Sequence, residues 1–203
     1  AGGLSLEANP LTISGGGTLQ SSGLKLNNAS SKLLLNSITL DNVSTSADSL
    51  GLDVDADSTV TSLSVGHITP VAILSGSSLS GGVTVSAGSL KLSEAGTLAS
   101  TVEMSGGVLD AEESSTVSGL LTHSGDIGID VATGKTLTYS GGTISLGANT
   151  LTLGGGGSLI SGGVTLNNAD SKLLLNSITV DNVSTSLASL GLDIDENSTV
   201  SSL

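Results

Sequence analysis

The sequence predicts an all-β protein, a right-handed parallel β-solenoid with rungs of about 20 to 25 residues. Three observations lead to this prediction. A long segment of the chain recurs almost unchanged, short alternating strands follow glycine turns at rung-like spacing, and aromatic residues are nearly absent. A sandwich of two antiparallel sheets is the alternative, but it needs longer strands and does not account for the repeated segment.

The repeated segment sets the domain organisation. Residues 141–203 align without a gap on residues 1–63, with about two-thirds of the positions identical, which indicates a tandem repeat. We therefore expect one continuous solenoid over residues 1–203, with a first copy at 1–140 and a partial second copy at 141–203. A bare solenoid end exposes core residues and strand edges, so we expect the sequence to be an excerpt of a longer chain.

Short strands are expected wherever apolar and polar residues alternate after a glycine. In such runs the apolar side chains face inward, and Ser, Thr, Lys or Asp face outward. Four glycine-led runs occur at 3–6, 23–26, 82–85 and 163–166, and three other period-two runs at 50–54, 136–139 and 150–153. No window has the apolar spacing of an amphipathic helix, so helix is expected to be nearly absent.

Turns are expected at glycines and at the paired asparagines Asn27-Asn28 and Asn167-Asn168, because Asn tolerates left-handed backbone geometry. The chain contains 29 Gly, no Cys, no Phe, no Trp and a single Tyr. Its core must therefore consist of small aliphatic side chains, without disulfides or thiolate metal sites.

Charge and hydropathy exclude several classes of partner. The net charge is −13, with five Lys and no Arg, so the basic surface that binds nucleic acid is missing. The longest aliphatic runs, such as residues 33–35, are far shorter than the roughly 20 residues of a spanning helix. We expect neither nucleic-acid binding nor membrane insertion.

Residues 147–153, which contain Thr-Leu-Thr-Leu, and residues 162–169, which begin Gly-Gly-Val-Thr-Leu-Asn, carry a family resemblance. They resemble the strand repeats of autotransporter passengers, filamentous adhesins and other giant bacterial surface β-solenoid proteins. The resemblance covers essentially the whole chain. It implies an extracellular or cell-surface location in a bacterium, and adhesive or structural work.

An acidic cluster is the one candidate metal site. Asp53, Asp55 and Asp57 alternate, so on a strand they would share one outward face, and the pattern partly recurs at Asp193 and Asp195. Carboxylate oxygens of this kind are Ca²⁺ ligands. The segment lacks the turn glycine and the later glutamate of a calcium loop, and a solvated acidic stripe is the alternative interpretation.

Catalytic motifs are incomplete. Thr133-Gly134-Lys135-Thr136 resembles the end of a phosphate-binding loop, but Ile129 stands where the first glycine belongs. His67 and His123 are the only histidines and have no partner at metal-ligand spacing. We predict that the chain is not an enzyme and has no cofactor, Ca²⁺ apart.

Outward threonine pairs at Thr136 and Thr138, and at Thr150 and Thr152, resemble those of ice-binding solenoids. In the sequence they are irregularly spaced, which makes ice binding a minor alternative.

The leading functional hypothesis is a structural module of a long secreted repetitive protein that forms a rod, a fibre or a cell-surface sheath. A stalk or passenger repeat of an adhesin, with an unknown surface ligand, is the alternative. The expected partners are further copies of the same repeat, including end-to-end self-association.

Overall fold

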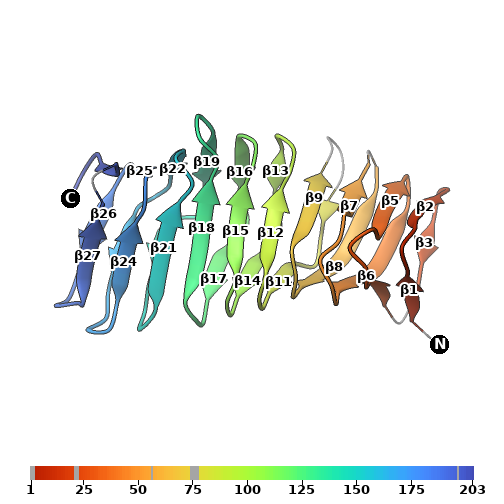
Figure 1. Ribbon diagram of the computed structural model, residues 1–203, viewed down its shortest axis with the longest axis horizontal. Coiled ribbons are helices and arrows are strands. Elements are labelled where there is room, and N and C mark those ends of the chain that lie inside the picture. The colour runs from red at the N-terminus through yellow and green to blue at the C-terminus, as the bar shows by residue number, and fades with distance from the viewer. Residues whose placement is uncertain (1–2, 21–22, 56, 74–77, 196) are drawn as a thin grey trace.

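The computed structural model describes residues 3–20, 23–55, 57–73, 78–195 and 197–203. Within these ranges the chain is entirely β, without a helix, and its strands stack in parallel as a β-solenoid of about nine turns. Figure 1 shows the rungs following one another from the N-terminal end to the C-terminal end of an elongated molecule. The predicted parallel β-solenoid is confirmed.

The strands lie on three faces, which the chain visits in the same order in every turn. Face 1 is a ten-stranded parallel sheet that runs the whole length of the molecule. Its strands are β2 (Pro10–Ser14), β5 (Lys32–Asn36), β7 (Gly51–Val54), β9 (Thr69–Ile73), β12 (Ser89–Leu92), β15 (Val108–Ala111), β18 (Ile127–Val131), β21 (Thr150–Gly154), β24 (Lys172–Leu175) and β27 (Gly191–Ile194).

Faces 2 and 3 consist of shorter strands, joined in two rungs by the seven-residue strands β6 (Thr39–Thr45) and β8 (Thr59–Val65). Face 2 contains β3 (Thr18–Leu19), β10 (Ser78–Leu79), β13 (Thr97–Leu98), β16 (Ser115–Val117), β19 (Thr136–Tyr139), β22 (Ser158–Ile160), β25 (Thr179–Val180) and β28 (Thr199–Val200). Face 3 contains β1 (Leu4–Leu6), β4 (Leu24–Leu26), β11 (Val83–Val85), β14 (Val102–Met104), β17 (Leu121–His123), β20 (Ile144–Ser145), β23 (Val164–Leu166) and β26 (Val183–Thr185).

All seven strands expected from the alternating runs are present, as β1, β4, β7, β11, β19, β21 and β23. The alternation fixes them because a parallel ladder orients every second side chain inward. In β24, for example, Leu173 and Leu175 are buried, whereas Lys172 and Leu174 lie at the surface.

Rung length varies while the ladders stay continuous. Leu33 pairs with Leu52, which is 19 residues later, and Ile129 pairs with Leu153, which is 24 residues later. The extra residues lie in the corners between strands. The predicted rung length is therefore correct at its lower end, at about 20 residues.

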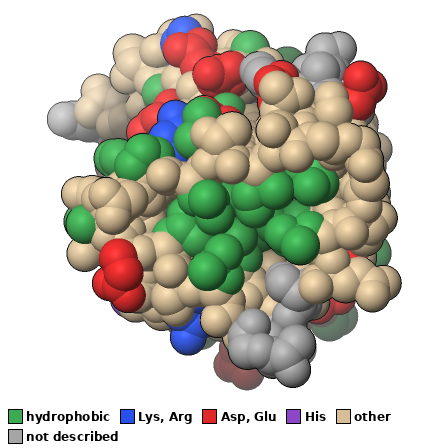
Figure 2. Space-filling model, turned by 90° about the vertical axis from the view of Figure 1, so that its right-hand side faces the viewer, with side chains coloured by type: hydrophobic (Ala, Val, Ile, Leu, Met, Phe, Trp, Pro, Cys, Tyr) green, Lys and Arg blue, Asp and Glu red, His purple; other side chains and the backbone are tan. Residues whose placement is uncertain are grey.

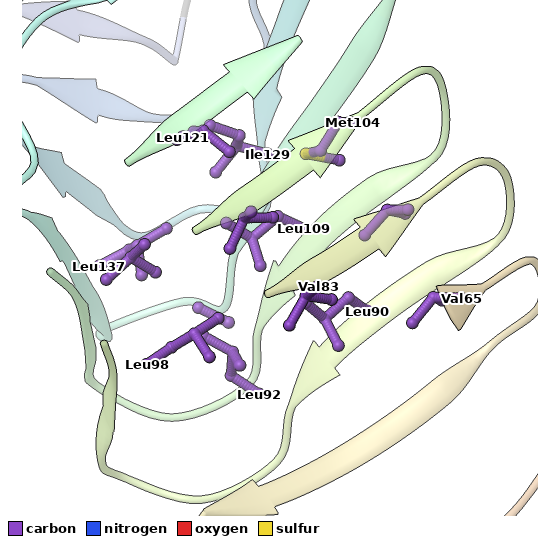
Figure 3. Packing of buried hydrophobic residues seen from close by; sticks show 14 of the residues in the cluster. Val65, Val83, Leu90, Leu92, Leu98, Met104, Leu109, Leu121, Ile129 and Leu137 are labelled. Carbon is purple, nitrogen blue, oxygen red and sulfur yellow. The ribbon is translucent and has the colours of Figure 1, made fainter. Parts of the chain in front are cut away.

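The core is a set of aliphatic stacks between the faces. Leu90, Leu109 and Ile129 occupy the same position in three successive strands of face 1, and all three are fully buried (Figure 3). Each such side chain contributes about 1.5–3 kcal/mol by leaving water. Because each layer contacts only the layers above and below it, the rungs stabilise one another rather than themselves.

The single aromatic residue departs from the predicted all-aliphatic core. Tyr139 is buried at the end of β19, and its hydroxyl oxygen accepts a hydrogen bond from the backbone N–H of Leu121, at 3.1 Å. Gly141 makes room for the ring, since a Cβ there would lie 2.6 Å from Tyr139 Cε2. One ring therefore fits because its polar end is bonded and its neighbour has no side chain.

Equivalent turns have the same hydrogen bonds in the two copies of the repeat. The backbone N–H of Asn28 donates to Ser31 Oγ at 3.0 Å, and that of Asn168 donates to Ser171 Oγ at 2.9 Å. Each hydroxyl then donates across to a backbone oxygen of the preceding rung, Leu6 O or Gly147 O, at 2.6 Å. These serines connect successive rungs inside the protein.

The asparagines form turns, but not with the predicted left-handed backbone. Their side-chain oxygens accept the backbone N–H two residues later, from Ser30 at 2.9 Å and from Asp170 at 3.0 Å. The left-handed positions fall instead on Ser37 (φ 54°) and Ser177 (φ 55°), which are equivalent residues of the two copies.

Replacing Leu52 with Ala should lower the free energy of unfolding by about 2–5 kcal/mol, because it leaves a cavity in a fully buried stack. Leu192 is the same repeat position in the last rung of face 1 and is only partly buried, so Leu192→Ala is the matched control and should cost much less. Urea unfolding followed by circular dichroism measures both. Equal losses would contradict this account of the core.

Candidate functional site

The structure divides the acidic segment between a strand and a corner. Asp53 lies on β7, where its carboxylate is 2.8 Å from Lys32 Nζ. The strand ends at Val54, so Asp55 and Asp57 follow it, and Asp57 lies in a turn with a φ of 65°. The expectation that the three carboxylates share one strand face is therefore wrong, because the chain turns a corner after Val54.

Asp195 in the second copy shows what this corner carboxylate does. Its two oxygens accept the backbone N–H of Ser177 at 3.0 and 3.1 Å, and one of them accepts Ser198 Oγ–H at 2.6 Å. The hydrogen bond from Ser198, followed by the one from the Ser177 backbone, holds the pKa of Asp195 below its usual range. Asp195 thus connects the left-handed corner of one rung to the next rung.

The remaining carboxylate of the candidate set, Asp193, is exposed on β27, opposite Leu174 of β24. Across the part of the chain that the structure describes, no three His, Asp or Glu side chains are grouped so that they could hold a metal ion. The positions of Asp53 and Asp195 favour ion pairing and turn stabilisation over metal binding.

A second group of charged residues, which the sequence analysis did not single out, lies on the outer side of face 1. Lys91 Nζ is 3.2 Å from the Asp110 carboxylate and 2.7 Å from that of Glu112. The Glu112 contact is the largest of the effects that raise the pKa of Lys91. Asp110 is also in register with Asp130, one rung further along.

Asp130 is the titratable group in the least favourable surroundings. Partial burial, followed by the negative charge of Asp110, raises its pKa above the usual value. The carboxylate occupies space that Gly154 leaves open, since a Cβ at Gly154 would lie 2.8 Å from Asp130 Oδ1. Lys91, Asp110 and Asp130 are about 20 residues apart in sequence, so only the strand register reveals the group.

The two histidines and the lysine of the glycine-containing loop do not come together. His67 Nδ1 is 3.8 Å from Asp48 Oδ1. His123 lies on β17, with its ring nitrogens 3.3 Å from Gly125 O and 3.1 Å from Ser145 O. Lys135 Nζ donates to Glu113 at 2.5 Å, an ion pair between neighbouring rungs. Each of these groups stabilises the corner or the rung pair in which it lies.

Outward hydroxyls are aligned on face 2, although they are irregularly spaced in the sequence. Successive rungs pair Thr18 with Thr39, Thr39 with Thr59 and Thr59 with Ser78. Two more rows continue the pattern: Thr97, Thr116 and Thr138, and then Thr136, Ser158, Thr179 and Thr199. The irregularity that argued against an ordered hydroxyl array belongs to the corners, because the corners absorb the differences in rung length.

Comparison of the chain with protein-family models, with curated proteins and with solved structures finds no match. Among the described residues, no helix is long and apolar enough to cross a membrane. The fold and its local contacts are therefore the basis of the functional argument.

Asp130→Asn should raise the melting temperature at neutral pH. Because the folded-state pKa is raised, the stabilisation linked to this proton is complete below the ordinary aspartate pKa and is lost as the pH rises through the folded-state pKa. The advantage of the variant should shrink as the pH falls towards about 4. Asp110→Asn is the control and should gain less, because it also removes the Lys91 ion pair. A lower melting temperature for Asp130→Asn at pH 7 would contradict the assignment.

Calcium should leave the melting temperature unchanged, because Asp53 is paired with Lys32 and Asp195 is occupied by its own turn. Scanning calorimetry with millimolar Ca²⁺, and again with a chelator, measures this. Magnesium at the same ionic strength is the control for screening. A stabilisation specific to Ca²⁺ that Asp53→Asn and Asp193→Asn abolish would establish a calcium site.

Proposed function

We propose that this chain is a structural module of a long, secreted, repetitive protein, in which it forms part of an extracellular rod, fibre or cell-surface sheath. The observation that supports the proposal is the continuity of face 1. Its ladder passes from β18 to β21 to β24, across the boundary at residue 140, with parallel pairing on both sides. A second copy therefore lengthens the solenoid instead of forming a separate domain.

The mechanism of such a module is mechanical. Parallel ladders along the whole rod resist bending and stretching, because every rung is bonded to both of its neighbours. The net charge of −13 and the Ser- and Thr-rich outer surface keep the rod hydrated and oppose side-by-side association. The resemblance to bacterial surface solenoids supports an extracellular location.

The alternative is the stalk of an adhesin, in which the same rod presents a recognition domain. The two proposals differ in what the rest of the protein contains. A folded, non-repetitive tip domain that binds a surface ligand favours the stalk. Ice binding remains a minor alternative, which the hydroxyl rows of face 2 support and thermal hysteresis measures.

Rod length should increase in proportion to copy number. Face 1 makes seven strand-to-strand steps from β2 to β21, one repeat later, and at about 4.8 Å per step each copy adds about 34 Å. Electron microscopy of chains extended by one and two further copies of residues 1–140 measures this increment. Particles that grow in width, or that show separate globules, would contradict the rod.

Location is a separate part of the proposal. Antibodies raised against this chain should label the surface of intact source cells, or material released from them, when viewed by immunogold microscopy. A cytoplasmic protein of the same cells serves as the control for leakage. Labelling confined to the cytoplasm would refute the extracellular assignment.

A further inference from the structure

The N-terminal end of the solenoid exposes positions that are buried elsewhere in the repeat. Leu4 is 50% exposed and Leu19 is 37% exposed, whereas their equivalents one repeat later, Ile144 and Leu159, are each 1% exposed. Figure 2 shows a continuous hydrophobic patch at the centre of this end. Because the same repeat positions are buried in the interior, the exposure comes from the missing neighbour and not from the residues themselves.

The interior also shows what covers this surface. β21 pairs with β18 and β22 pairs with β19, so the rung at residues 127–139 lies directly over the rung at residues 144–160. Ile127 is in register with Leu151, and Leu137 is in register with Leu159. The equivalent rung over residues 4–20 would carry the same strand pairing.

A glycine triplet identifies the fit independently. Gly155, Gly156 and Gly157 lie against the corner loop at residues 132–135 of the preceding rung. A Cβ at Gly156 would lie 2.5 Å from Thr133 Oγ1, a Cβ at Gly157 would lie 2.6 Å from Ala132 O, and a Cβ at Gly155 would overlap Val131 O. These three glycines are required because side chains would displace that loop.

The same triplet recurs at the N-terminal end without the loop. At Gly15, Gly16 and Gly17, a Cβ would meet no atom of the described residues within 4 Å. The end surface therefore carries a site shaped for a loop that is present one repeat later and absent here.

The C-terminal end shows the complementary feature. Ile194 is 46% exposed, whereas its equivalent Val54 is fully buried. Gly51 (φ 97°) lies against the next rung, where a Cβ would overlap Pro70 O and lie 2.8 Å from Pro70 C. Its equivalent Gly191 has nearly the same backbone angle, φ 107°, and no described atom within 4 Å of a Cβ.

We propose that the two ends are docking surfaces for specific rungs of further copies of this repeat. The N-terminal end takes a rung like residues 127–139, whose corner loop lies on Gly15–Gly17. The C-terminal end takes a rung like residues 69–85, whose Pro70-like carbonyl lies against Gly191. This inference rests on the proposed repetitive rod and adds that neighbouring copies must follow the 140-residue phase.

The phase excludes a simple stacking of two such chains. A second folded copy presents its 191–203 rung or its 4–20 rung at its ends, whereas the rungs that fit, 127–139 and 69–85, are inside it. The partner is therefore a repeat segment that ends on the matching rung, joined in series with this chain.

Gly16→Ala tests the proposal in two chains, the chain as it stands and the same chain with a copy of residues 64–140 joined ahead of Ala1. In the unextended chain the substitution should have little effect, because Gly16 has no left-handed φ and no close neighbour among the described residues. In the extended chain Gly16 should adopt the geometry of Gly156 (φ 85°) under the loop. There the melting temperature should fall by about 5 °C.

Hydrogen exchange gives the local measurement. Amides of residues 4–20 should become protected in the extended chain and should lose that protection with Gly16→Ala. Gly156→Ala is the control and should destabilise both chains. Equal effects of Gly16→Ala in the two chains, or unchanged exchange of residues 4–20 on extension, would overturn the proposal.

Sedimentation of the unextended chain tests the other possible occupant. Association that grows with concentration and is abolished by Gly16→Ala would show that the C-terminal rung of a second copy occupies the glycine triplet, and would refute the 140-residue phase. A single sedimenting species supports the phase. These measurements use the isolated chain, so they remain valid even if the source protein is not extracellular.

Discussion

Parallel stacking at a fixed spacing of about 4.8 Å is the constraint on which the rest of this structure depends. Each residue of a strand must fit the residue directly above it and the residue directly below it. Inward positions therefore become aliphatic stacks such as Leu90, Leu109 and Ile129. Outward positions become rows, and the same register that aligns threonines on face 2 places Asp130 against Asp110. Favourable and unfavourable pairs thus have one cause.

Variation in rung length is confined to the corners, where hydrogen bonds replace regular pairing. Ser31 and Ser171 bond across to the preceding rung, and Asp195 bonds to the Ser177 backbone. Glycines allow corners of adjacent rungs to approach closely, as Gly157 does beneath Ala132. The corners therefore determine which rung can follow which, whereas the strands accept any aliphatic neighbour. This difference explains how a low-complexity sequence specifies one stacking order.

Several features could be predicted from sequence because they depend on local patterns. Period-two alternation located β19 and β21, and the tandem match identified turns that the structure repeats in both copies. The acidic cluster was a weaker case. Alternation at Asp53, Asp55 and Asp57 indicated a shared strand face, but the strand ends at Val54. The sequence contained no signal for the Lys91, Asp110 and Asp130 group, because about 20 residues separate each member from the next.

The sequence by itself determined that the chain is a repetitive all-β solenoid with an aliphatic core, because strand alternation and tandem identity are properties of the linear order. Only the tertiary structure decided the register, and register is a relation between residues one rung apart. It decided that Tyr139 is accommodated beside Gly141, that Asp195 stabilises a corner, and that identical glycine triplets are covered at 155–157 and bare at 15–17. The identity of a neighbouring rung, which no single rung encodes, is what makes these residues differ.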